Sequence, residues 1–81
     1  MAQNMFTIYS KTGCPYCSKI ENIMDLGDFK HVVYKLGVDF TRDEFYAEFG
    51  QGSTFPQVVM DEQKLGGCTD TVKYLKENNM V

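Results

Sequence analysis

Two cysteines separated by two residues stand between a predicted strand and a predicted helix, and this junction most restricts how the chain can fold. Residues 5–9 (MFTIY) are apolar and rich in β-forming residues, which predicts a strand. Pro15 suits the first position of a helix, and apolar residues recur at helical spacing over residues 16–24. Cys14 and Cys17 therefore lie at the start of a helix that directly follows a strand.

The rest of the chain predicts three further strands and two further helices. Strands are expected at 31–36, at 57–60 and in a short segment that ends near Leu65. A second helix capped by Thr41 runs through Phe49, with Glu44 at the capping-box position, and Thr69 or Asp70 can cap a last helix. The order β-α-β-α-β-β-α, with a crossover between parallel strands at its start, predicts a small α/β domain.

Length and charge limit the classes of function. The chain has 81 residues, enough for one domain over 1–81, and its net charge of −3 disfavours nucleic acid as a partner. The sequence contains no apolar run of about 18 residues, so no membrane span is predicted. Residues 1–4 show no basic patch followed by an apolar stretch, so we expect no signal peptide and a cytoplasmic location. In a reducing compartment, a Cys-x-x-Cys pair is more often catalytic or metal-binding than structural.

The spacing of Cys14 and Cys17 favours redox chemistry. Residues i and i+3 at a helix start lie one turn apart, within reach of a disulfide. Cys14 is expected at the N-cap, where its thiolate accepts a hydrogen bond from the N3 backbone N–H and is stabilised by the helix dipole. With Lys11 nearby, such surroundings lower a cysteine pKa from about 8.5 to roughly 3.5–7.5. Cys14 is predicted to attack, and the less exposed Cys17 to resolve the intermediate.

Two structural alternatives remain open for this pair. One is half of a zinc site, which needs four ligands and has only Cys68, His31 and carboxylates left to complete it. The other is a permanent structural disulfide, which would close a very small loop and constrain the unfolded chain little. The third cysteine, Cys68, is read as a small buried residue or as a site of regulatory oxidation.

Three segments resemble the dithiol glutaredoxins. Residues 9–17 (YSKTGCPYC) look like the active-site segment of that family, residues 54–58 (TFPQV) like its Thr-Val-Pro segment, and residues 66–70 (GGCTD) like its Gly-Gly-x-x-Asp segment. The resemblance implies a thioredoxin-like fold, with a four-stranded mixed sheet flanked by three helices. It also implies a glutathione-dependent thiol–disulfide oxidoreductase that reduces protein disulfides and glutathione mixed disulfides, with glutathione as co-substrate and no resident metal.

The resemblance also implies roles for individual residues. Pro56 would be a cis-proline, and the backbone of Phe55, which stands where the family usually has valine, would pair with the cysteinyl part of glutathione. The bulky ring of Phe55 could change the groove that receives the partner protein. Thr69 and Asp70 would bind the γ-glutamyl end, because a helix N-terminus offers free N–H groups to a carboxylate.

Other residues would complete this glutathione site. Lys11 would attract the glycine carboxylate of glutathione, and Gly67 would let the backbone come close to the ligand. Tyr16 and Thr54 would border the same groove, and Cys68, at a variable position of the Gly-Gly segment, is also read as a second glutathione acceptor. The expected partners are glutathione and disulfide-containing or glutathionylated proteins, with ribonucleotide reductase among the family's partners, and we expect a monomer.

Two other functions compete with this one. A redoxin reduced by thioredoxin reductase would use the same cysteines with another electron source, but Lys11, Tyr16, Thr69 and Asp70 favour glutathione. A module that binds an iron–sulfur cluster or zinc is the third hypothesis. Cluster-binding relatives usually carry Cys-Gly-Phe-Ser, and Pro15 makes a shared cluster less favourable.

Overall fold

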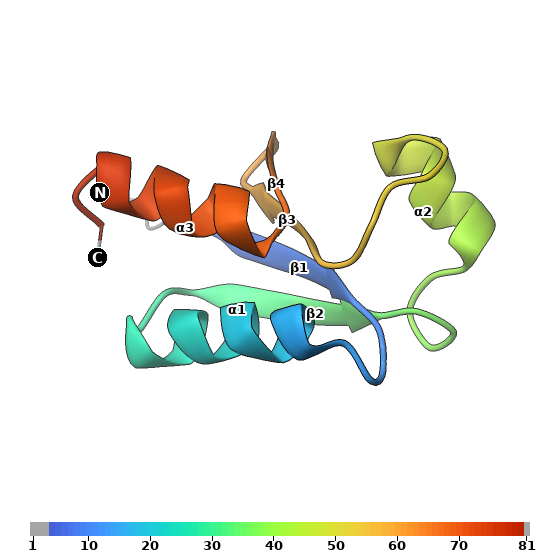
Figure 1. The fold of residues 1–81 in the computed structure, drawn as a ribbon, viewed down its shortest axis with the longest axis horizontal. Helices are drawn as coiled ribbons and strands as arrows, with labels where there is room; N and C mark the ends of the chain where they lie inside the picture. Colours follow the sequence, from blue (N-terminus) through green and yellow to red (C-terminus); the bar gives the residue numbers. More distant parts are fainter. Residues whose placement is uncertain (1–3, 81) are drawn as a thin grey trace.

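The computed structural model describes residues 4–80, and these residues form four strands and three helices (Figure 1). The elements are β1 (Phe6–Ser10), α1 (Pro15–Leu26), β2 (His31–Lys35), α2 (Arg42–Phe49), β3 (Gln57–Met60), β4 (Gln63–Gly66) and α3 (Cys68–Glu77). The predicted order of strands and helices is confirmed. No helix within residues 4–80 is long and apolar enough to cross a membrane.

The four strands form one mixed sheet in the order β2-β1-β3-β4. β1 and β2 are parallel, as the predicted crossover requires, and Ser10 pairs with Lys35 at the end of that ladder. β3 runs antiparallel to β1, with Ile8 opposite Val58, and β4 is antiparallel to β3. This arrangement brings the end of β1, the start of β3 and the end of β4 to one edge of the molecule.

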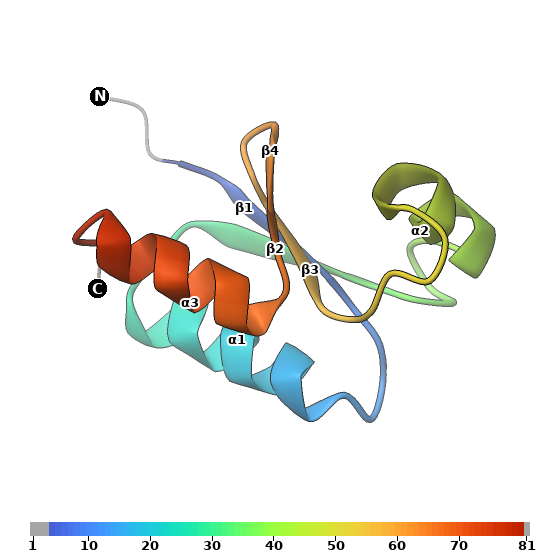
Figure 2. The same cartoon turned by 45° about the horizontal axis from the view of Figure 1, so that its top comes forward.

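Helices α1 and α3 lie side by side on one face of the sheet (Figures 1 and 2). Alternate residues of β1 are fully buried against them, as the two-residue period of a strand requires. The core between sheet and helices consists of Phe6, Ile8, Ile20, Met24, Val58, Met60, Cys68 and Leu75.

Helix α2 stands apart from the other two helices, beyond the carboxyl ends of β1 and β2 (Figure 2). It begins with the predicted capping box, in which Thr41 and Glu44 exchange side chain–backbone hydrogen bonds. Aromatic rings fasten it to the rest of the molecule: Phe45 stacks on Phe55 at 4.1 Å between centroids, and Tyr9 meets Phe49 edge to face at 4.9 Å. These contacts link α2 to β1 and to the segment that precedes β3.

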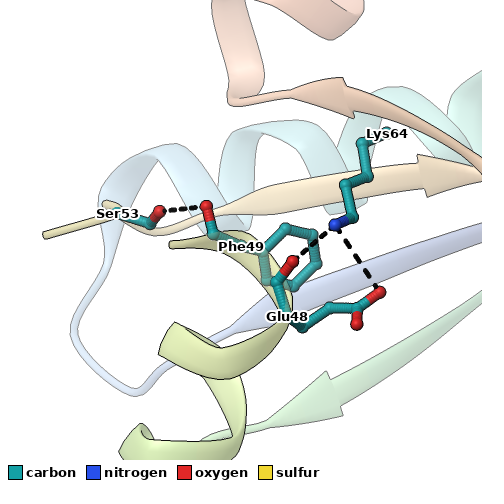
Figure 3. A network of polar contacts seen from close by, with 4 residues as sticks. All are labelled: Glu48, Phe49, Ser53 and Lys64. Carbon is teal, nitrogen blue, oxygen red and sulfur yellow. Dashed lines mark hydrogen bonds and ion pairs between the residues drawn. The ribbon is translucent and has the colours of Figure 1, made fainter. Parts of the chain in front are cut away.

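A second group of contacts ties the end of α2 to β4 (Figure 3). Lys64 donates a hydrogen bond to the Glu48 carbonyl and lies 3.9 Å from the Glu48 carboxylate, with its ammonium over the Phe49 ring. Ser53 Oγ donates to the Phe49 carbonyl at 2.8 Å. The end of α2 is thereby tied to β4, and the loop that follows is tied back to the helix through Ser53.

The start of α3 differs from the sequence prediction. The helix begins at Cys68 with Gly67 at the N-cap, whereas Thr69 or Asp70 was expected there. The Asp70 carboxylate, at N3, accepts a hydrogen bond from the Gly67 backbone N–H at 3.4 Å. The helix starts earlier because this side chain reaches back to Gly67, which supplies the cap backbone without a side chain of its own.

Candidate active site

The turn after β1 places both active-site cysteines at the start of α1. Cys14 is the N-cap residue, and the Cys17 backbone N–H donates to its Sγ at 3.2 Å. Their Cα atoms are 5.2 Å apart and their sulfurs are joined in a disulfide. Cys14 is half-buried, whereas Cys17 is 1% exposed. Attack from outside can therefore reach Cys14, and Cys17 is the protected sulfur.

Local backbone chemistry explains how this turn forms. Gly13 has a φ of +75°, a left-handed conformation that other residues adopt with strain. Pro15 follows at the first helical position, where a backbone N–H has no partner within the helix. Gly13 and Pro15 therefore fix the two sides of Cys14.

The segment before β3 lies against the active site from a second direction. The Phe55–Pro56 peptide bond is cis, as the family resemblance implied. The Phe55 ring stacks on Phe45 of α2, and Lys11 Nζ lies 5.4 Å from its centroid. The Phe55 ring, which stands where the family usually has valine, therefore packs against Phe45 within the molecule. The Lys11 ammonium lies over the same ring.

The start of α3 supplies a third side. Gly66 has a φ of +104°, and a Cβ built on it would lie 2.7 Å from the Asp70 carboxylate. Only glycine leaves room there for Asp70 to reach back to Gly67. Backbone N–H groups at this helix start are positioned for an anion, since the first residues of a helix lack acceptors within it.

An open cavity of about 200 Å³ lies between the first turn of α1, the segment before β3 and the start of α3. It is lined by Tyr16, Thr54, Phe55, Pro56, Gly67, Cys68, Thr69 and Asp70. Every residue predicted to bind glutathione is among them except Lys11, which lies beside the cavity over the Phe55 ring. Tyr16 is 60% exposed and so borders the cavity instead of packing in the core of α1.

Cys68 is a lining residue that sequence reasoning did not assign to the site. It is free and 6% exposed, and it belongs to the hydrophobic core. Burial raises the pKa of the Cys68 thiol, although Lys19 acts weakly in the opposite direction. Its place at the first position of α3, between two glycines and Thr69, was the signal that could have placed it here.

The fold and the Cys-x-x-Cys pair together define a small thiol–disulfide oxidoreductase with a thioredoxin-like fold. A family model described as glutaredoxin matches residues 6–65. The chain belongs to the glutaredoxin family.

Individual relatives agree with this assignment. The glutaredoxin of Vibrio cholerae is 32% identical over 78 residues, which cover 88% of this chain and 90% of the relative. The crystal structure of glutaredoxin 1 from Francisella tularensis, complexed with cacodylate, matches with a TM-score of 0.78 at 25% identity, over 95% of this chain and 96% of that one. A buckwheat glutaredoxin–glutathione complex matches in fold, with a TM-score of 0.73 at 23% identity, over 95% of this chain and 73% of that one.

The surroundings of His31 bear on the zinc alternative. Its Nδ1 lies 2.8 Å from the Phe29 carbonyl and its Nε2 lies 3.3 Å from the Asp25 carboxylate. Within residues 4–80, no group of three or more His, Cys, Asp or Glu side chains could hold a metal ion.

Proposed function

We propose that this thiol–disulfide oxidoreductase depends on glutathione, reducing glutathione mixed disulfides and protein disulfides through Cys14 as nucleophile and Cys17 as resolving thiol. The observation that carries the proposal is the cavity lined by Tyr16, which stands between the two cysteines in sequence, and by residues 54–56 and 67–70. Three segments distant in sequence thus contribute residues that the family resemblance assigns to glutathione. The relative from buckwheat was solved as a complex with glutathione, which supports the same ligand here.

The chemistry of the cavity fits the two ends of glutathione. The γ-glutamyl end carries a carboxylate and an ammonium; the first N–H groups of α3 suit the carboxylate and the Asp70 side chain suits the ammonium. The glycine carboxylate would lie toward Lys11, whose ammonium stands over the Phe55 ring. The cysteinyl sulfur would then lie between these ends, facing Cys14.

The proposed reaction on a glutathione mixed disulfide has two exchange steps. The Cys14 thiolate attacks the glutathione sulfur, a bond forms between these two sulfurs, and the target protein leaves as a thiolate that takes up a proton. The thiolate of a second glutathione attacks the mixed disulfide, releasing glutathione disulfide and regenerating the Cys14 thiolate. For a protein disulfide, the Cys14 thiolate first attacks one sulfur of the target, and the other target sulfur leaves as a thiolate that takes up a proton. The Cys17 thiolate then displaces the target from Cys14, and two glutathiones later reduce the resulting Cys14–Cys17 disulfide.

The test is turnover of a glutathionylated small disulfide with glutathione as reductant. Cys14→Ser should abolish turnover, whereas Cys17→Ser should retain much of it, because the first reaction needs a single thiol. Cys17→Ser should instead lose most activity on a protein disulfide. Complete loss of both reactions in Cys17→Ser would contradict the single-thiol step.

A comparison of electron donors separates this proposal from a redoxin served by thioredoxin reductase. The oxidised protein is mixed either with glutathione or with thioredoxin reductase and its reductant, and disulfide reduction is followed in each. Faster reduction by glutathione supports the proposal, and faster reduction by the reductase overturns it.

The proposal also covers the compartment, the domain extent and the oligomeric state in which the protein acts. A glutaredoxin couple at about −200 to −230 mV exchanges readily with a glutathione pool, which favours a reducing compartment such as the cytoplasm. A single domain over residues 1–81, acting as a monomer, is proposed, with the family match at 6–65 as its support. Electron donation to ribonucleotide reductase stays a prediction from the family alone.

A further inference from the structure

We infer that the hydroxyl of Ser10 is a hydrogen-bond partner for the Cys17 sulfur, engaged when the Cys14–Cys17 disulfide opens. Ser10 ends β1 and is fully buried, directly before the turn that carries Lys11. The inference rests on disulfide exchange at this cysteine pair, and it does not depend on glutathione as the reductant.

The first observation is an unpaired polar atom in the core. Ser10 Oγ is buried and has no hydrogen-bond partner within residues 4–80. Thr71, the other fully buried polar residue of this region, donates its hydroxyl to the Gly67 carbonyl at 2.8 Å. A buried hydroxyl without a partner destabilises the fold, so its presence needs a reason.

The second observation is the register between β1 and α1. α1 connects two parallel strands and therefore runs antiparallel to β1, as both views show (Figures 1 and 2). The buried residues of β1 are Phe6, Ile8 and Ser10, and those of α1 are Cys17, Ile20 and Met24.

These two rows match in length and direction. Two strand residues advance roughly 6.6 Å, and three or four helix residues advance about 4.5–6 Å. Counting the two buried rows in opposite directions from the Met24 end pairs Met24 with Phe6 and Ile20 with Ile8. The same count pairs Cys17 with Ser10, so the inference sets the unpaired hydroxyl toward the buried sulfur of the disulfide.

This placement would stabilise the sulfur that leaves when the disulfide is reduced. When a reductant thiolate attacks Cys14 Sγ, a new sulfur–sulfur bond forms there, the Cys14–Cys17 bond breaks, and its electron pair leaves on Cys17 Sγ. The helix N–H of Cys17 is directed to Cys14 Sγ, so it does not serve the leaving sulfur. Cys17 is buried from water, and the Ser10 O–H can donate to its thiolate until a proton arrives from the solvent.

The inference predicts opposite effects of Ser10→Ala in the two redox states. In the oxidised protein the substitution removes an unpaired hydroxyl, so thermal stability should stay equal or rise. In the reduced protein it removes the partner of Cys17, so stability should fall. By linkage, the equilibrium should move about tenfold toward the disulfide, which for this two-electron couple is about 30 mV more reducing.

The experiment equilibrates the full chain with graded ratios of reduced and oxidised dithiothreitol and measures the disulfide fraction by alkylation and mass spectrometry. Thr71→Val is the matched control, because it removes a buried hydroxyl that already has a partner. It should lower stability equally in both redox states and leave the equilibrium unchanged. A tenfold shift in Ser10→Ala alone supports the inference. An unchanged equilibrium in Ser10→Ala, or an equal shift in both variants, overturns it.

Since dithiothreitol does not need the glutathione cavity, failure here is distinguishable from failure of the proposed function. Ser10→Ala removes a single oxygen atom, so the fold itself is expected to persist. Thermal unfolding of both redox forms provides the second readout. Equal changes in stability in the two forms would contradict the inference and, by linkage, would accompany an unchanged redox equilibrium.

Discussion

Cys14 and Cys17 carry the same chemical group, and one turn of helix gives them different surroundings. Cys14 caps the helix and accepts the Cys17 N–H, while Cys17 points into the core at 1% exposure. The spacing and Pro15 were enough to predict this difference. The sequence could not show that Ser10 lies unpaired on the same face, because that depends on how β1 and α1 align in space.

Cys68 is predicted to react more slowly than Cys14 in the reduced protein. Burial raises its pKa, so the thiolate fraction at neutral pH is lower than that of an ordinary cysteine. With iodoacetamide at pH 7, we expect Cys14 to be modified first and Cys68 only slowly, with the Cys68 rate rising as the pH approaches its raised pKa. Peptide mapping after timed quenching measures both rates.

The control for this prediction is the same reaction in denaturant. Unfolding removes the burial, so Cys68 should then react like any exposed cysteine at that pH. Rapid modification of Cys68 in the folded protein at pH 7 would contradict the prediction and would favour a role in regulatory oxidation.

At the scale of elements, hydrophobic periodicity predicted all strands and helices, and the largest misplacement was at the start of α3. A search for Ser, Thr or Asp at the N-cap misses a helix whose N-cap is glycine and whose acidic residue acts from N3. The same local chemistry matters for function, since it directs the first N–H groups of α3 into the cavity. Capping at this helix is therefore tied to the candidate ligand site.

The aromatic attachment of α2 could not be predicted from the sequence beyond the shared face of Phe45 and Phe49. The helix has a weak apolar face, and Phe45 is its buried residue among those the structure describes. Phe45 stacks on Phe55, which belongs to the segment that lines the cavity. Packing of α2 and the shape of the active site are therefore coupled through one pair of rings.

Replacing Phe45 by Ala should lower the free energy of unfolding by about 3–5 kcal/mol, because it leaves a cavity among stacked rings. Phe45→Leu keeps most of the apolar volume and should cost less. Leu26→Ala, at a residue that is 88% exposed, is the control and should change stability by roughly 0.5 kcal/mol or less. Urea unfolding of the oxidised proteins measures all three. A Phe45→Ala loss no larger than that of Leu26→Ala would show that α2 is not held by this ring.

At the scale of the whole molecule, three segments far apart in sequence meet at one edge of the sheet. The turn before α1, residues 54–56 and residues 66–70 come together because β3 pairs antiparallel with β1 and β4 pairs antiparallel with β3. The family resemblance named these segments, but only the sheet order explains why they meet. The cavity at this edge is lined by Tyr16 of α1, residues 54–56 and residues 67–70. The contact of Lys11 with the Phe55 ring did not follow from the family pattern, because the family usually has valine at position 55.

The most direct test of the proposed function is the site at which glutathione becomes attached. The Cys17→Ser variant is incubated with glutathione disulfide, and the product is analysed by intact mass and peptide mapping. We predict one glutathione per chain, attached to Cys14, because Cys14 is the accessible thiol at the helix start and the variant has no resolving thiol. Attachment to Cys68 instead, or no adduct under conditions in which reduced Cys14 is alkylated, would contradict the account.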